Sequence, residues 1–374
     1  MQYSDFESIG RKISKLGFGL MRLPKKSDSD ETIDRQEALR LVDLAVKSGV
    51  NYFDTAYVYH GGDSENFVKE ALGRYPRDSY CLATKLPGWV IKEQGKHTDE
   101  LFNEQLEKCG VDYFDFYLLH AVNREIMDVF EADDSYNRLK KQKEAGKIKH
   151  LGFSYHGDLE FFKELLDKYE WDFAQLQINY YDWDATDAKS FYKELEIRNI
   201  PCIIMEPVRG GSLHTLNAEA KKVFEDLGEA SAASYALRFD LELPDVLTVL
   251  SGMSTYEQVE DNIKTFSECS PLTDTEKDAI SRANVLFRQN FAIPCTDCKY
   301  CVETCPVGVD IPACFGAYNE YNKTRNTEDF KTSYDRIPAE KRADNCIECG
   351  ACAKHCPQQI KIPERLKKVA EMSK

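Results

Sequence analysis

The segment Phe114-Asp-Phe-Tyr-Leu-Leu119 is apolar along most of its length and is the clearest guide to the fold of this chain. A strand with one face in water alternates apolar and polar residues, whereas a strand covered on both faces of a parallel sheet forms a nearly continuous apolar run. Runs of the same kind occur at residues 201–205 and 246–250. These three segments predict buried parallel strands.

Further runs of β-branched and aromatic residues lie on either side of them. Together they predict eight strands, at residues 15–19, 50–54, 80–84, 114–119, 150–154, 173–178, 201–205 and 246–250. Amphipathic segments such as 35–48 and 158–169 separate the strands, which is typical of an α/β fold with a parallel sheet. An open doubly wound sheet also satisfies this alternation. Eight units within residues 9–266 match the length of a (β/α)8 TIM barrel, which we expect for residues 1–266.

The composition of the 374-residue chain is that of a folded soluble protein, with 42% hydrophobic and 30% charged residues. Its formal net charge of -15 repels nucleic-acid phosphates and anionic lipids, so we expect neither nucleic acid nor a membrane as a partner. No run approaches the roughly 18 apolar residues that span a bilayer, and the opening sequence has no basic segment followed by an apolar one. We therefore expect a cytoplasmic protein.

The cysteines divide the chain into two parts. Nine of the 13 lie between Cys295 and Cys356, so the chemistry changes near residue 290. This distribution does not match a disulfide framework spread over a small secreted fold. We expect residues 267–289 to form a linker or helix and residues 290–374 to form a second domain.

Polar residues follow three adjacent strands of the predicted barrel. Asp54 and Tyr59 come after the second strand, Lys85 after the third and His120 after the fourth. Each of them alone has an ordinary explanation, as a helix cap, a half-buried aromatic, a surface lysine or a core histidine. Because reacting groups of such barrels sit at the carboxyl ends of the strands, the four together predict an active site.

The chemistry of these four side chains suits reduction of a carbonyl group, which needs a hydride at carbon and a proton at oxygen. Tyr59 can supply the proton if its pKa, about 10 for a free phenol, is lowered. An ammonium at Lys85 would lower it by attracting the phenolate, and Asp54 would keep that ammonium in place and charged. A neutral His120 can donate a hydrogen bond to the oxygen as it gains negative charge.

The same residues carry a resemblance to the aldo/keto reductase superfamily. The motifs are Gly49-Val-Asn-Tyr-Phe-Asp54-Thr-Ala-Tyr-Val-Tyr59, Ala-Thr-Lys85, Leu-Leu-His120, Leu16-Gly-Phe-Gly-Leu-Met-Arg-Leu23 and Gly152-Phe-Ser154. The similarity covers most of residues 9–266. It implies a barrel, an oxidoreductase, Tyr59 as the proton donor, Lys85 and Asp54 as its support, and His120 as the group that orients the substrate.

The resemblance also implies a site for the nicotinamide of NAD(P)H. Ser154 and Gln175 would hold the nicotinamide carboxamide. Met205 takes the place of the aromatic residue that usually stacks on the nicotinamide ring, and a thioether packs less specifically on a flat ring.

The choice between NADH and NADPH stays open. Gln258 and Asn262 would bind the adenosine, and Arg209 is the candidate for the pyrophosphate. Gly252 and Gln258 stand where the family usually places the basic residues that pair with a 2′-phosphate. We therefore expect NADPH to bind no more than about tenfold better than NADH.

The strongest motif of the chain occurs twice after residue 290. Each copy has the form Cys-x2-Cys-x2-Cys-x3-Cys-Pro, which is typical of a pair of 4Fe–4S clusters. The close triplet binds one cluster, and the fourth cysteine binds the other. The predicted ligands are therefore Cys295, Cys298, Cys301 and Cys356 for one cluster and Cys346, Cys349, Cys352 and Cys305 for its partner. Two zinc ions are the alternative.

This module resembles the bacterial two-cluster ferredoxin domains. The segments Val-Asp310-Ile-Pro312 and Ile-Lys-Ile-Pro363 each follow a Cys-Pro pair and precede helix-forming sequence, so we expect a mostly helical ferredoxin-like domain. A domain this short has little core of its own, so a purely structural role of the clusters is an alternative. Cys314 is left over and is expected to be a small buried hydrophobe.

Three functions fit these features. The first is a reductase that acts on a carbonyl-containing small molecule with NAD(P)H and exchanges electrons through the clusters with a partner protein of the ferredoxin or flavodoxin type. A nicotinamide moves two electrons and a cluster moves one, so coupling them normally needs a flavin, for which the sequence shows no clear motif. The second function is a reductase fed with single electrons by the clusters, without NAD(P)H. The third is a nicotinamide-sensing binding protein with structural clusters.

Overall fold

The computed structural model describes residues 1–27, 32–268, 270–290 and 292–373. Residue 269, which falls in the expected linker, lies outside the described residues. The chain forms two compact units. The first comprises Met1–Pro207 and Ala236–Leu272, and the second comprises Val208–Tyr235 and Thr273–Lys374. From the sequence we expected residues 1–266 to form the barrel, whereas the structure groups Val208–Tyr235 with the second unit.

The first unit is a closed barrel of eight parallel strands, which confirms the predicted (β/α)8 fold. The strands are β3 (Leu16–Gly19), β4 (Tyr52–Asp54), β5 (Cys81–Leu86), β6 (Phe114–Val122), β7 (Ile148–Tyr155), β8 (Phe173–Gln177), β9 (Cys202–Met205) and β10 (Val246–Gly252), and β10 closes the barrel by pairing with β3 and β9. Each strand overlaps one predicted run. The apolar runs at residues 114–119 and 246–250 are buried along their whole length, as expected of strands that are covered on both faces.

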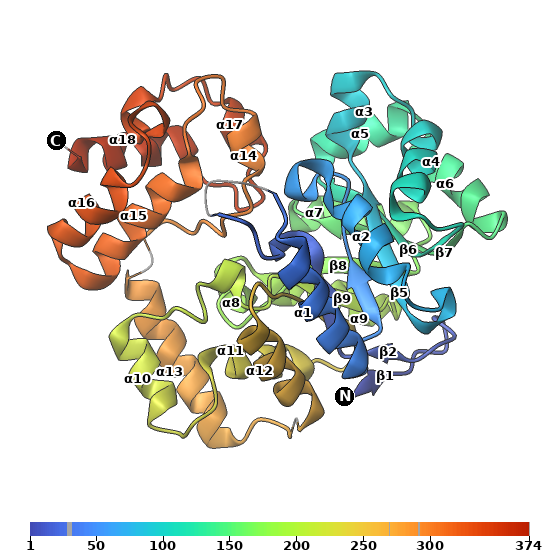
Figure 1. Cartoon of the computed structure of the whole chain (residues 1–374), viewed down its shortest axis with the longest axis horizontal. Coiled ribbons are helices and arrows are strands. Elements are labelled where there is room, and N and C mark those ends of the chain that lie inside the picture. Colours follow the sequence, from blue (N-terminus) through green and yellow to red (C-terminus); the bar gives the residue numbers. More distant parts are fainter. Residues whose placement is uncertain (28–31, 269, 291, 374) are drawn as a thin grey trace. The chain divides into compact units, whose positions relative to one another are not determined.

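Helices surround these strands, as Figure 1 shows for α1, α2, α4, α6 and α9. The helices of this unit are α1 (Arg35–Lys47), α2 (Ser64–Leu72), α3 (Gly88–Gln94), α4 (Thr98–Cys109), α5 (Arg124–Ala132), α6 (Ser135–Glu144), α7 (Leu159–Lys168), α8 (Asp182–Ala185), α9 (Ala188–Arg198) and α12 (Tyr256–Ser267), and α11 (Ala232–Leu241) begins in the second unit and ends in the first. In α1 the buried residues recur at helical spacing, and Asp34 caps the helix by accepting a hydrogen bond from the backbone of Glu37.

A short hairpin covers the end of the barrel where the strands begin. Its strands β1 (Tyr3–Ser4) and β2 (Ile13–Ser14) pair antiparallel, and Ser4 Oγ donates to the carbonyl of Leu247 near the start of β10 over 2.6 Å. Ile9 and Ile13 pack there with barrel-interior side chains such as Phe116. The opposite end, where the strands finish, is therefore the one at which a site can form.

The second unit is mostly helical, as predicted. Its helices are α10 (Ala218–Glu225), α13 (Asp274–Asn290), α14 (Tyr300–Glu303), α15 (Ile311–Thr324), α16 (Thr327–Asp335), α17 (Ala351–Lys354) and α18 (Ile362–Met372). Its core includes Val309, Ile311, Phe315, Ile362 and Val369. Helices α15 and α18 each carry a proline in their first turn, where the missing backbone N–H costs nothing.

The two cysteine runs of this unit fold in the same way. In the first run the second and fourth residues after Cys295, which are Asp297 and Lys299, have φ values of 53° and 65°. In the second run Glu348 and Gly350 stand at the same positions, with φ values of 56° and 76°. Helices α14 and α17 then follow. The repeated sequence motif thus produces a repeated backbone.

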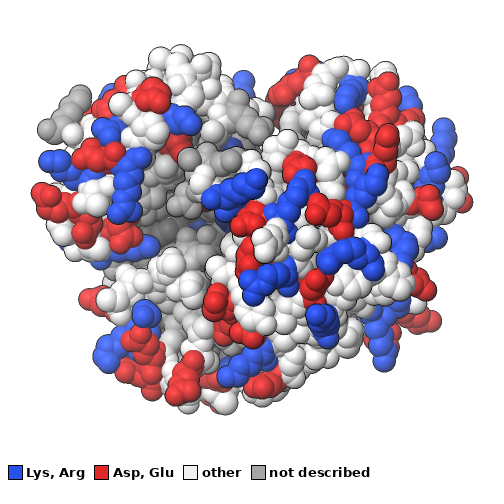
Figure 2. Space-filling view, viewed as in Figure 1, with Lys and Arg blue, Asp and Glu red and all other residues white. Residues whose placement is uncertain are grey.

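No helix among the described residues is long and apolar enough to cross a membrane. The face shown in Figure 2 carries acidic and basic side chains interspersed with uncharged ones.

Candidate active site and cluster sites

A buried ion pair joins the ends of strands β4 and β5. Lys85 Nζ donates a hydrogen bond of 2.6 Å to Asp54 Oδ1 and one of 2.7 Å to the carbonyl of Thr55. The Lys85 side chain is 1% exposed. Burying a charge is costly unless it is paired, so this arrangement requires both partners.

Tyr59 and His120 lie beside this pair. Lys85 Nζ is 5.1 Å from the centroid of the Tyr59 ring. The Tyr59 and His120 ring centroids are 6.3 Å apart, and Trp89 packs on His120 with a centroid distance of 5.0 Å. The structure therefore brings the four predicted catalytic residues together, and Trp89 is an additional aromatic wall.

Burial dominates the electrostatics of this site. It raises the pKa of the Asp54 carboxyl and lowers the pKa of the Lys85 ammonium, and the attraction between the two opposes both changes. Burial, and then the charge of Lys85, hold the pKa of His120 well below its usual value. His120 is consequently a neutral imidazole at neutral pH, and a neutral imidazole can donate one hydrogen bond.

The backbone next to His120 is strained. Ala121 has a φ of 52°, which a residue with a side chain rarely adopts, and the register of β6 shifts between Leu119 and Val122. The backbone N–H of Ala121 donates to Ser154 Oγ over 2.8 Å. Ser154 on β7 thus fixes the turn that follows His120.

A buried polar network supports Lys85 from helices α2 and α4. Gln105 Nε2 donates to Glu65 Oε1 over 2.6 Å and to the carbonyl of Lys85 over 3.1 Å, and Thr84 donates to the same Glu65 oxygen. Tyr117 donates to Gln105 Oε1. Sequence reasoning did not find these residues, because only the folded barrel places them under the active site.

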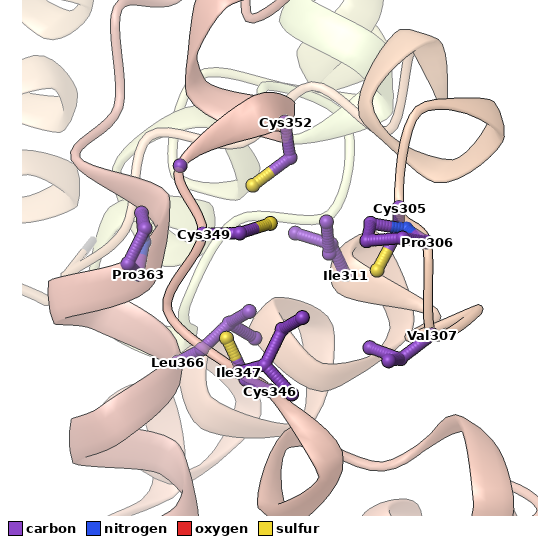
Figure 3. Close-up of a pocket in the computed structure, with 11 residues that line it drawn as sticks. Cys305, Pro306, Val307, Ile311, Cys346, Ile347, Cys349, Cys352, Pro363 and Leu366 are labelled. Carbon is purple, nitrogen blue, oxygen red and sulfur yellow. The ribbon is translucent and has the colours of Figure 1, made fainter.

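The cluster unit contains a pocket lined by thiols. Cys305, Cys346, Cys349 and Cys352 border it together with apolar residues that include Ile311 and Leu366. Figure 3 shows the four cysteines arranged around the pocket, with Cys305 on the opposite side from Cys349. No group of three metal-binding side chains among the described residues converges on a single ion. A cubane cluster does not require such convergence, because each thiolate binds a different iron.

The second set of cysteines gathers around Cys301. Burial raises the pKa of the Cys301 thiol, and the nearby thiols of Cys298, Cys295 and Cys356 raise it further. The division of the eight cysteines between two clusters stays a prediction from the motif spacing. Cys314 is buried, with its Sγ 3.9 Å from the carbonyl of Lys341.

Backbone amides in this unit point at cysteine sulfurs. Asp297 N–H donates to Cys295 Sγ over 3.5 Å, and Glu348 N–H donates to Cys346 Sγ over 3.4 Å at the equivalent position of the second run. Val309 N–H donates to Cys305 Sγ over 3.3 Å. Such hydrogen bonds stabilise thiolates and tune the potential of iron–sulfur clusters, so these residues fit the group.

Comparison with known proteins decides the family of the barrel. Residues 15–285 match the sequence model of the aldo/keto reductase family. This chain belongs to the aldo/keto reductase family. Residues 294–360 of the reductase match the model of a 4Fe–4S dicluster domain, so the chain combines an oxidoreductase barrel with an iron–sulfur domain.

Several relatives of this reductase have names that state an activity. L-galactose dehydrogenase from Arabidopsis thaliana is 25% identical over 285 residues, which cover 71% of this chain and 88% of that protein. NADH-specific methylglyoxal reductase from Escherichia coli is 24% identical over 295 residues, covering 67% of this chain and 89% of that protein. The solved aldo-keto reductase AKR11C1 from Bacillus halodurans superposes with a TM-score of 0.62 at 26% identity, over 76% of this chain and 96% of that one.

The reductase places its predicted nicotinamide-binding residues side by side. Ser154 on β7 is in register with Gln175 on β8, and Gln175 Nε2 lies 3.4 Å from Met205 Sδ on β9. Within the part of the chain that the structure describes, the buried Gln175 Oε1 has no hydrogen-bond partner. It can accept a hydrogen bond from the amide of a carboxamide, so these residues fit a nicotinamide.

The two residues predicted to bind adenosine bond within the reductase itself. Gln258 Oε1 accepts a hydrogen bond from the backbone of Ser254, and Asn262 Nδ2 donates to Ser251 Oγ. A cation that sequence reasoning missed lies close by. The stem of Arg22 packs 3.1 Å from the position of a Cβ on Gly252, and its guanidinium is 3.5 Å from Glu206 Oε1. The sequence signal that could have identified Arg22 is its position between Met21 and Leu23 in the family motif near the start of the chain.

Arg209, the residue predicted for the pyrophosphate, belongs to the second unit. Its guanidinium donates to the carbonyl of Pro294 and to Gln358 Oε1. The pyrophosphate role stays a prediction, and these contacts give Arg209 a place in the cluster unit.

Proposed function

We propose that this reductase converts a carbonyl group of a small molecule into an alcohol with NAD(P)H, at the end of the barrel where the strands finish. The observation that carries the proposal is the buried Asp54–Lys85 pair beside Tyr59 and His120. These side chains supply a proton donor, a charge that supports it and a neutral hydrogen-bond donor.

When bound, NAD(P)H would supply a hydride to the carbonyl carbon. Tyr59 donates its phenolic proton to the carbonyl oxygen, so the C=O double bond becomes a C–H and an O–H bond. Lys85, near the Tyr59 ring, stabilises the phenolate that is left, and Asp54 holds Lys85 in place. His120 donates a hydrogen bond to the oxygen while negative charge develops on it.

For the cofactor, we assign Ser154 and Gln175 to the carboxamide and Met205 to the face of the nicotinamide ring. We assign Gln258 and Asn262 to the adenosine. Arg22 is the cation best placed to meet a 2′-phosphate near Gly252, but its ion pair with Glu206 already uses part of its charge.

In the second unit, we assign one 4Fe–4S cluster to Cys295, Cys298, Cys301 and Cys356 and one to Cys346, Cys349, Cys352 and Cys305. Bound clusters supply or accept single electrons, and we expect a ferredoxin- or flavodoxin-type protein as their partner. Ile347, which borders the thiol-lined pocket, is 60% exposed, and Cys349 is exposed as well. This edge is therefore accessible to such a partner.

A turnover assay with anaerobically purified protein tests the proposal. Methylglyoxal and an aldose are suitable first probes, each with NADH and with NADPH, followed by nicotinamide absorbance. We expect oxidation of the nicotinamide that depends on the carbonyl compound and is lost in Tyr59→Phe. Binding of neither cofactor would contradict the proposal.

Single-electron reduction of the substrate at the same site is a second candidate, because Gln258 and Asn262 are both engaged within the protein. Two electrons from the clusters and two protons would then give the alcohol. Substrate reduction by chemically reduced protein, in the absence of any nicotinamide, would favour this candidate.

A further inference from the structure

Arg209 is a buried cation that belongs to the second unit. Its side chain is 1% exposed. The backbone around it forms a left-handed turn, with φ values of 51° at Arg209, 63° at Gly210 and 89° at Gly211. Two glycines accept this conformation easily, whereas an arginine adopts it only where the surrounding contacts require it.

The turn is pressed against the first cysteine run. A Cβ atom added to Gly210 would clash with the carbonyl oxygen of Thr296. Only a glycine permits the two backbones to approach this closely. The turn therefore brings the Arg209 side chain next to the segment that begins with Cys295.

The guanidinium bridges two segments that are distant in sequence. Nη1 donates to the carbonyl of Pro294 over 3.4 Å, and Nη2 donates to Gln358 Oε1 over 3.1 Å. Pro294 directly precedes Cys295, and Gln358 follows Cys356 by two residues. A rigid planar group with several donors is suited to hold two such acceptors at once.

The charge of Arg209 lies close to these ligand segments. Its guanidinium contacts Pro294, which precedes Cys295, and Gln358, which follows Cys356 by two residues. One-electron reduction adds a negative charge to an iron–sulfur cluster. A nearby buried cation stabilises that added charge more strongly than a cation in water does.

We propose that Arg209 is a positioning residue that holds the segments of Cys295 and Cys356 together and raises the reduction potential of the cluster they bind. The other cluster is unaffected. The inference rests on the ligand assignment made under the proposed function.

Redox titration of the full chain, monitored by EPR spectroscopy, tests this inference. Arg209→Gln removes the charge, and Arg209→Lys keeps it while removing the planar fork. In Arg209→Gln we expect the ratio of reduced to oxidised cluster at a fixed potential to fall about tenfold for one cluster, a shift of about 59 mV for a one-electron couple. Arg209→Lys should retain most of the potential. Arg282→Gln, at an exposed position of α13 in the same unit, should change neither cluster.

A loss of iron is equally informative. If Arg209→Gln loses the cluster bound by Cys295 and Cys356 and keeps the other cluster at its wild-type potential, the positioning role is supported. In a Cys298→Ala background, where the first cluster is absent, Arg209→Gln should have no further effect. Unchanged potentials with full iron content, or an equal shift of both clusters, would overturn the inference. A wild-type protein without iron and sulfide would contradict the cluster assignment instead, before any variant is made.

Discussion

The ammonium nitrogen of Lys85 lies 2.6 Å from Oδ1 of Asp54, and both side chains are almost fully buried. If one of the two charged groups is removed, the other stays buried and cannot be solvated by water. The pair therefore couples the stability of the barrel to the active site, since the same ammonium lies beside the Tyr59 ring. This coupling makes the proposed catalytic residues testable by unfolding as well as by turnover.

Removal of one partner of this pair should destabilise the protein strongly. We expect Asp54→Asn to lower the free energy of unfolding by about 3–5 kcal/mol, because it leaves a buried cation without a carboxylate. Urea unfolding of the cluster-loaded protein measures this change. In the double variant Asp54→Asn/Lys85→Met the loss should be smaller than the sum of the two single losses. Asp5→Asn, at an exposed position with a 3.9 Å ion pair, is the control and should change stability by less than about 0.5 kcal/mol.

Removal of the Tyr59 hydroxyl should abolish most of the turnover. Tyr59→Phe keeps the ring but loses the proton donor, so we expect carbonyl reduction to fall roughly 10²-fold or more while cofactor binding is retained. Steady-state kinetics and fluorescence titration measure the two effects. Tyr52→Phe is the matched control, since Tyr52 lies in the barrel core, and it should leave turnover unchanged. Equal turnover in Tyr59→Phe would move the chemistry away from this site.

His120 gives the protein a defined dependence of stability on pH. Its pKa in the folded protein is well below that of the unfolded chain, so between these two values the unfolded chain binds a proton that the folded protein does not. The contribution of His120 to the free energy of unfolding therefore has its full value above about pH 6.5. It falls as the pH decreases, by up to about 1.4 kcal/mol per pH unit.

Urea unfolding at a series of pH values checks this sign. The slope should be shallower in His120→Asn, which lacks the titrating group, and unchanged in His214→Asn at an exposed position. The half-buried His156, whose pKa is lowered to about 4, should preserve part of the slope in both variants. A wild-type stability that rises on acidification would contradict the prediction.

The two cysteine runs should each depend on the other. Wild-type protein should contain about eight irons per chain, because two 4Fe–4S clusters carry four each. Because Cys305 is assigned to the cluster of the second run, Cys305→Ala/Cys346→Ala should retain about half of the iron, whereas Cys305→Ala/Cys298→Ala should lose nearly all of it. Iron and sulfide analysis separates these cases. Cys314→Ala should keep the full content, and zinc without sulfide in the wild type would reject the assignment.

Much of the barrel could be predicted because its strands are local patterns. The apolar runs are buried on both faces, and the order of strands in a (β/α)8 barrel places Asp54, Lys85 and His120 on one rim without further information. The cysteine spacing was equally informative, since each run forms its left-handed turns within a few residues.

The position of Arg209 could not be predicted in the same way. The Arg-Gly-Gly sequence indicates a turn, but its partners Pro294 and Gln358 lie far away along the chain. Hydrogen bonds between distant segments depend on the complete fold, which local sequence does not encode. The stacking of Arg22 over Gly252 is another contact between distant segments that local sequence did not reveal.

The ion pair between Arg22 and Glu206 leads to a prediction about cofactor choice. If the segment around Gly252 receives the adenosine, a 2′-phosphate meets the guanidinium of Arg22 but also the carboxylate of Glu206, 3.5 Å from it. Attraction and repulsion then partly cancel, so NADPH should bind no more than about tenfold better than NADH, a difference of about 1.4 kcal/mol. Glu206→Gln should increase the preference for NADPH several-fold, because it removes the repulsion between the carboxylate and the 2′-phosphate. Arg22→Gln should abolish that increase in the double variant while leaving NADH affinity nearly unchanged.

Fluorescence titration with both cofactors measures each affinity, and Arg40→Gln, at an exposed position of α1, is the control for a general charge effect. A preference that is the same in all four proteins of the cycle would show that a different residue meets the phosphate.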